Sequence, residues 1–149
     1  MRDILFYHCI HSKIETVLPL LLIKILNKKK RVLIIMKDQK RISEINILLW
    51  VFKSNSWLAH GSKEDGDPDL QPIWLTYLDE NPNKAQILLL LDGTISQNFI
   101  KYDRILVLFH EKDLKSLLQA RNIWKKGKIE GYKMSYYKEY TTGKWSQKY

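Results

Sequence analysis

The sequence has few of the residues that several common kinds of site require. It contains one cysteine, Cys9, in 149 residues. This excludes internal disulfides and any zinc site built from several cysteines. Its six glycines occur in neither the Gly-x-x-x-x-Gly-Lys nor the Gly-x-Gly-x-x-Gly pattern, so no turn is built to bring a nucleotide phosphate onto the backbone. We therefore expect no nucleotide and no other cofactor.

Long hydrophobic runs are also absent. The longest one, residues 17–26, contains Pro19 and Lys24 and is too short to span a bilayer. The first residues include Asp3 and lack the layout of a signal peptide. We therefore expect a cytoplasmic protein with no membrane partner. The composition, 45% hydrophobic and 28% charged, indicates a globular chain, and its length predicts one domain over residues 1–149.

Negative charge is scarce at both ends of the chain. The net charge of +9 divides into +6 over residues 1–50, −4 over residues 51–100 and +7 over residues 101–149. A segregated positive charge favours a basic surface with an acidic or polyanionic partner. The run from Lys28 to Arg31 belongs to this charge, although cations also suit the end of a helix, where the helix dipole is negative.

Hydrophobic patterning predicts alternating strands and helices. Three continuous apolar runs are typical of strands buried on both faces: residues 32–36, 87–91 and 105–109. Two shorter strands are predicted at residues 4–7 and 72–76, and an edge strand is predicted at residues 132–140. Helical spacing marks residues 18–28, 39–52 and 110–128. The segment 53–71 is rich in Gly, Ser, Asp and Pro and is predicted to be a long loop.

This alternation predicts an α/β fold with three layers, in which helices cover both faces of a mostly parallel sheet. Such a domain is Rossmann-like but without a nucleotide-binding loop. Ser12 and Glu15 have the spacing of a capping box, so we expect a turn there before the first helix. Asp38 is a good N-cap for the second helix.

The last predicted helix contains an arginine in an unusual place. On a helical wheel, one apolar stripe is formed by Leu114, Leu117, Leu118 and Trp124. Arg121 lies in the middle of this stripe, flanked by Lys125 and Lys128. Arginine is rarely buried without a partner. Either an internal carboxylate pairs with Arg121, or the stripe continues into an exposed groove for a ligand that is both acidic and apolar.

Other candidate sites do not meet the requirements of their chemistry. His8 and Cys9 point to opposite faces of a strand, so with His11 they do not form a metal site. The acidic stretch 65–69 resembles the start of a calcium loop but lacks its glycine and its final glutamate. No nucleophile elbow and no paired His and acid are present. We therefore expect no metal site and no catalytic residue.

Three groups of residues spread along the chain form a recognisable pattern. They are Leu49-Trp50 with residues 57–61, residues 71–76 with Asn81-Pro82-Asn83, and Ala120-Arg121-x-x-Trp124-Lys125 followed by Lys128, Gly131, Tyr136, Gly143 and Trp145. Their order and spacing resemble the chi subunit of bacterial DNA polymerase III, an accessory protein of the clamp-loader complex. The resemblance covers almost the whole chain. It implies an α/β domain related to nucleotide-binding folds but without their phosphate loop.

The resemblance implies a non-catalytic adaptor of DNA replication. Chi proteins bind the acidic, apolar-ended C-terminal tail of single-stranded-DNA-binding protein, and they bind the psi subunit, which connects them to the clamp loader. The family's tail site matches Arg121, Trp124 and Lys125, and its psi-facing aromatic matches Trp57. On the same helical face, Leu117 can supply apolar wall and Lys128 can attract further carboxylates.

A direct single-stranded nucleic-acid-binding module is the alternative function. Five tryptophans, eight tyrosines and the net charge would suit base stacking together with phosphate neutralisation. Most of these aromatics, however, fall on apolar stripes or in apolar runs, which favours a place in the core. The adaptor function is therefore the preferred interpretation.

Overall fold

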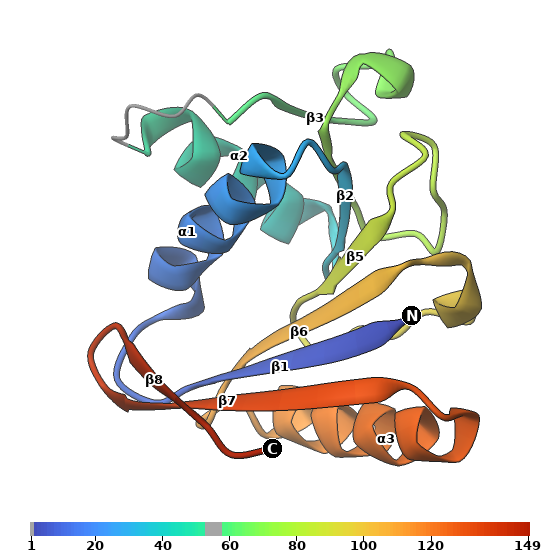
Figure 1. The fold of residues 1–149 in the computed structure, drawn as a ribbon. Helices are drawn as coiled ribbons and strands as arrows, with labels where there is room; N and C mark the ends of the chain where they lie inside the picture. The colour runs from blue at the N-terminus through green and yellow to red at the C-terminus, as the bar shows by residue number, and fades with distance from the viewer. Residues whose placement is uncertain (1, 53–57) are drawn as a thin grey trace.

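The computed structural model describes residues 2–52 and 58–149, which build one eight-stranded sheet (Figure 1). The strand order is β3-β4-β2-β5-β6-β1-β7-β8. Paired strands are parallel except for β7 and β8, which are antiparallel. The predicted mostly parallel sheet is confirmed. The strands are β1 Asp3–Cys9, β2 Val32–Ile35, β3 His60–Ser62, β4 Ile73–Thr76, β5 Ile87–Leu90, β6 Arg104–His110, β7 Lys133–Thr141 and β8 Lys144–Gln147.

Helices cover the two faces of this sheet, which gives the three predicted layers. Helices α1 (Ile14–Asn27) and α2 (Gln39–Val51) pack on one face, and α3 (Leu114–Glu130) packs on the other, below β7 in Figure 1. Strands β2, β4 and β5 are buried along their whole length because side chains on both faces meet helices or loops. No helix in the described part of the chain combines the length and hydropathy needed to cross a bilayer.

The start of α1 differs from the prediction. The helix begins at Ile14 rather than near residue 18, and it includes Pro19. Proline removes one backbone donor, but the residues before it still adopt the helical conformation. The predicted capping box is wrong: Lys13 is the N-cap residue without a side-chain cap, and the Ser12 hydroxyl instead donates a hydrogen bond to Glu139. In the second helix, Asp38 caps as predicted and accepts from the Arg41 amide.

Two predictions about the ends of the sheet are also corrected. The predicted edge strand is β7, which lies inside the sheet between β1 and β8. Strand β8, which the sequence did not reveal, forms the edge and is short and partly polar. At the opposite edge, β3 and a 3₁₀ turn at Pro68–Leu70 occupy part of the segment that was predicted to be a loop.

The buried face of helix α3 is not its apolar stripe. Leu114 and Leu118, two residues of the predicted apolar stripe, are 75% and 57% exposed. The buried face consists of small residues and one isoleucine: Ser116, Ala120, Ile123 and Gly127. Small side chains let the helix backbone approach the sheet closely, so the larger apolar residues lie at the side of the contact or outside it.

Candidate functional site

A hollow of about 280 Å³ lies where α3 meets β1 and β7. It is lined by Leu117, Ala120, Arg121, Trp124 and Lys125 from α3, by His8 from β1 and by Tyr136 from β7. Helix α3 is well defined at both ends. The Asp113 side chain accepts from the Ser116 amide, and Gly131 ends the helix in the left-handed conformation, with φ of 78°. The residues from Leu117 to Lys125 therefore lie within a regular part of the helix, beside β7.

The structure brings together most of the residues predicted for the site. Leu117, Arg121, Trp124 and Lys125 all line the hollow, because positions three and four apart share one helix face. Lys128 is exposed one turn further along α3 and does not line it. Trp57 lies outside the described residues.

The apolar wall of the hollow is an aromatic cluster around Trp124. The ring centroid of Trp124 lies 5.4 Å from that of Phe6, 6.0 Å from that of Tyr136 and 4.8 Å from that of Tyr149. The last two contacts are edge-to-face, an arrangement that aromatic quadrupoles favour. Trp124 is half-buried, so one part of the indole packs on the core while another part faces the hollow.

Two cations stand at the rim. Arg121 and Lys125 are both exposed, and no carboxylate in residues 2–52 and 58–149 lies within 4.0 Å of either charged group. Of the two alternatives for Arg121, the described part of the chain therefore offers the exposed apolar and basic groove rather than an internal ion pair. Burial raises the pKa of the Tyr136 phenol, and the nearby Arg121 guanidinium opposes this rise.

His8 and Tyr136 form the inner side of the hollow, and the sequence analysis assigned neither of them to this site, although Tyr136 is part of the family pattern. The Nδ1 atom of His8 lies 2.7 Å from the Tyr136 hydroxyl, whereas its buried Nε2 has no hydrogen-bond partner among the described residues and lies 3.6 Å from a Glu111 carboxylate oxygen. Burial lowers the pKa of His8, and Lys138 lowers it further. Strand alternation places His8 on one face, but only the β1–β7 register brings Tyr136 beside it.

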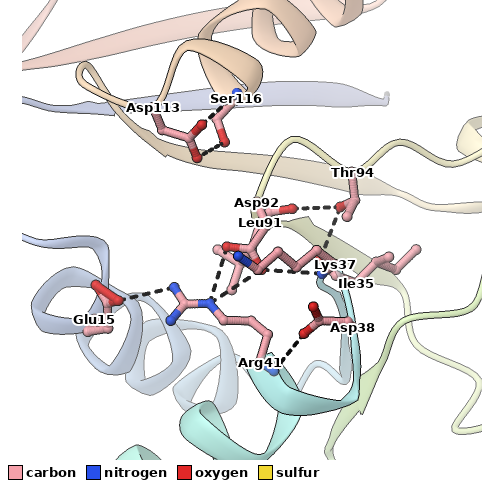
Figure 2. A network of polar contacts seen from close by, with 10 residues as sticks. All are labelled: Glu15, Ile35, Lys37, Asp38, Arg41, Leu91, Asp92, Thr94, Asp113 and Ser116. Atoms are coloured by element: carbon pink, nitrogen blue, oxygen red, sulfur yellow. Dashed lines mark hydrogen bonds and ion pairs between the residues drawn. The ribbon is translucent and has the colours of Figure 1, made fainter.

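A separate polar network lies at the carboxyl ends of the strands (Figure 2). Arg41 pairs with Asp92 at 3.2 Å and with Glu15 at 3.1 Å, which connects α1, α2 and the end of β5. The backbone amide of Lys37 also donates to Asp92. Ligands of open α/β sheets usually bind at this edge. Here Arg41 pairs with both Asp92 and Glu15, so these charged groups bind one another and stabilise the packing of the three elements.

The turn between β1 and α1 is occupied by Glu139. Its fully buried carboxylate accepts from the backbone amides of Ile10, His11 and Ser12 at 2.7–3.0 Å and from that of Gly143 at 2.9 Å. The Ser12 hydroxyl is a further donor. Burial opposes ionisation, but these hydrogen bonds outweigh it and lower the pKa of Glu139 to about 2. In nucleotide-binding folds, the backbone amides of the turn after the first strand bind a phosphate. In this chain the Glu139 carboxylate accepts hydrogen bonds from the amides of that turn instead.

Comparison with known proteins places the chain in a family. The family model described as DNA polymerase III chi subunit, HolC, matches residues 1–135, which include every α3 residue of the hollow. A protein of Rickettsia prowazekii (strain Madrid E), named probable DNA polymerase III subunit chi, is 28% identical over 94 residues, which cover 63% of this chain and 57% of that protein. The match therefore spans less than two thirds of the relative's length. The chain belongs to the DNA polymerase III chi subunit family, whose members are accessory subunits in DNA replication.

Proposed function

We propose that this chain is a non-catalytic, cytoplasmic adaptor that binds the acidic C-terminal tail of single-stranded-DNA-binding protein in the α3 hollow. It connects that tail to the clamp loader, through psi where psi is present. The observation that carries the proposal is the pair of exposed cations, Arg121 and Lys125, beside an apolar hollow with no carboxylate of the described chain near them.

The chemistry of the hollow suits a peptide that ends in an apolar side chain and carries several carboxylates. The apolar side chain enters between Trp124 and Leu117, and its burial contributes about 1.5–3 kcal/mol. A carboxylate pairs with the planar Arg121 guanidinium, which offers two parallel donors. Lys125 and Lys128 follow Arg121 along α3, so carboxylates further from the peptide end meet cations as well.

The connection to the clamp loader is proposed for the region of Trp57, the aromatic that the family resemblance assigns to psi. The described residues just before it support this choice. Ile47, Trp50 and Val51 at the end of α2 are 62%, 58% and 63% exposed. An exposed group of large apolar side chains at a helix end favours a protein partner. Because α2 and α3 cover opposite faces of the sheet, both partners can bind at once (Figure 1).

The test is the change Arg121→Ala, measured by fluorescence anisotropy with a labelled peptide of the tail. A hydrogen bond to a charged group contributes roughly 1.5–3 kcal/mol, so we expect tail affinity to fall about 10- to 100-fold. Lys125→Ala should cost less, and its effect should shrink at high salt because an exposed cation acts mainly through screened attraction. The melting temperature should not change in either variant, since both side chains are exposed.

Lys115→Ala is the matched control, because Lys115 is an exposed cation of α3 that does not line the hollow. This variant should bind the tail like the parent protein. If Arg121→Ala also binds like the parent, or if it unfolds the chain, the proposed site is wrong.

A further inference from the structure

A second group of cations lies far from the α3 hollow, at the end of α1. Lys24, Lys28, Lys29 and Lys30 are all exposed. None of these lysines has an acidic group within 4.0 Å in the described part of the chain. Arg31 differs from them, because its guanidinium donates to the carbonyl of Asn83. One helix end therefore presents four free positive charges that the tail site does not use.

Two of these lysines line a shallow groove between α1 and the sheet. Lys24 and Lys28 stand on one side of it, and Leu5 and Tyr7 of β1, with Arg104 of β6, stand on the other. The groove has a volume of about 80 Å³. Helix α1 packs over β6, so the groove lies at the border of the part of this sheet face that α1 covers.

Beyond the groove, the same face of the sheet carries three aromatic residues. Tyr7 stacks on Tyr137 with ring centroids 5.2 Å apart, and Trp145 meets Tyr7 edge-to-face at 5.6 Å. The strand register places all three on one face, opposite to α3. In Figure 1 no helix lies over β7 and β8 on this face, whereas β1 is partly covered by α1. The three side chains are half-buried, so part of each ring system stays accessible.

The carboxylates that α1, β1 and β7 contribute to this face are already paired. Asp3 accepts two hydrogen bonds from Arg104, at 2.8 and 2.9 Å. Glu139 is buried and bonded to the turn after β1, and Glu15 on α1 pairs with Arg41. The charge left over is that of the four lysines. A phosphate backbone beside the end of α1 would therefore meet cations, because the carboxylates of α1, β1 and β7 on this face are already engaged.

We propose that this face, formed by the lysines of α1 and the cluster Tyr7, Tyr137 and Trp145, binds single-stranded nucleic acid. The lysines neutralise phosphates and the aromatic cluster contacts bases, which is the combination that sequence-tolerant single-strand binders use. A duplex does not fit it, since its bases are stacked within the helix and cannot reach the rings. This function goes beyond tail binding, and the two sites lie on opposite faces of the sheet, so one molecule can hold the tail and a strand together.

The experiment measures binding of the full chain to labelled oligothymidylate and oligouridylate of about 15 nucleotides, the upper range of a single-domain site. The double variant Lys24→Ala/Lys28→Ala is compared with Lys40→Ala/Lys63→Ala, which removes the same charge from exposed residues elsewhere. Losing two phosphate contacts should weaken binding roughly tenfold or more at low salt. It should also reduce the slope of log K against log salt by about 1.4. The control should lose much less, and tail-peptide binding should be unchanged in both variants.

Photocrosslinking with iodouracil-substituted oligomers gives the position of the strand. Crosslinks at Tyr7, Tyr137 or Trp145 support the proposal, and the stronger of the two oligomer arms identifies the strand as DNA or RNA. The proposal is overturned if neither oligomer binds at low salt or if duplex DNA binds equally well. It is also overturned if the two double variants bind alike or if the crosslinks map to α3. Failure of the tail site would appear separately, in the peptide titration.

Discussion

The arginines of this chain show how neighbouring residues decide what a side chain does. Arg104 donates two hydrogen bonds to Asp3, and Arg41 pairs with Asp92 and Glu15. Both connect elements of the fold. Arg121 carries the same group but stands exposed beside an apolar hollow, away from any described carboxylate. A guanidinium in that position keeps its donors free for an acidic partner.

Glu139 is the residue whose ionisation contributes most clearly to stability. Its pKa of about 2 in the folded chain lies below the ordinary glutamate value of 4.5. A lowered folded pKa adds stability that is fully present above about pH 4.5 and is lost as the pH falls towards 2. A pKa lowered to this extent corresponds to a contribution on the order of a few kcal/mol. We therefore expect Glu139→Gln to lower the free energy of unfolding by about that amount at pH 7, as measured by urea denaturation.

The same variant should lose the part of the pH dependence between 4.5 and 2 that Glu139 contributes, so its stability should fall less steeply than that of the parent as the pH is lowered. Glu130→Gln, at the exposed end of α3, is the control and should keep the pH profile of the parent. A Glu139→Gln profile that matches the parent would show that the amides after β1 are satisfied in another way.

At the scale of elements, the packing of α3 depends on its small residues. A Cβ atom added at Gly127 would lie 2.8 Å from Met134 Sδ and 2.9 Å from Ile4 Cδ1. Ile4 Cδ1 is the end of its side chain and Met134 Sδ lies one atom before the end of a flexible one, so both atoms can shift to relieve the contact. We expect Gly127→Ala to be nearly neutral, because the better helix propensity of alanine, about 1 kcal/mol, offsets the crowding. Gly127→Leu should destabilise by about 1–3 kcal/mol through overpacking.

Thermal melting of the two variants measures this difference. Gly131 offers a contrasting position, since its φ of 78° favours glycine while nothing lies within 4 Å of an added Cβ. Gly131→Ala should therefore destabilise through backbone conformation and not through contact. If Gly127→Leu melts like the parent, α3 does not pack against the sheet as closely as the structure indicates.

At the scale of the whole molecule, the sheet separates the proposed partner sites. The α3 hollow lies on one face, and α2, which leads to Trp57, lies on the other. Trp57→Ala should therefore abolish association with the clamp loader while tail-peptide affinity stays within about twofold of the parent. Pull-down with clamp-loader subunits and peptide titration measure the two effects. A large loss of melting temperature with association intact would instead make Trp57 a core residue.

The sequence by itself determined most of the architecture. Continuous apolar runs such as Val32 to Ile35 predicted buried strands, because only a strand covered on both faces lacks polar alternation. Helical spacing predicted α2 and α3 and placed Leu117, Arg121, Trp124 and Lys125 on one side of α3, since positions three and four apart are neighbours on any helix. These features depend on local geometry, which a linear pattern records.

Only the tertiary structure decided what lies across from those residues. His8 and Tyr136 meet because β1 pairs with β7, a register that no local pattern encodes. Glu139 bonds to Ser12 across more than one hundred residues, and this contact replaced the local capping box that spacing had predicted. The buried side of α3 likewise follows from how closely its backbone approaches the sheet rather than from hydrophobicity along the helix. The apolar wall and the basic rim of the site were local features, whereas its inner side depended on strand pairing.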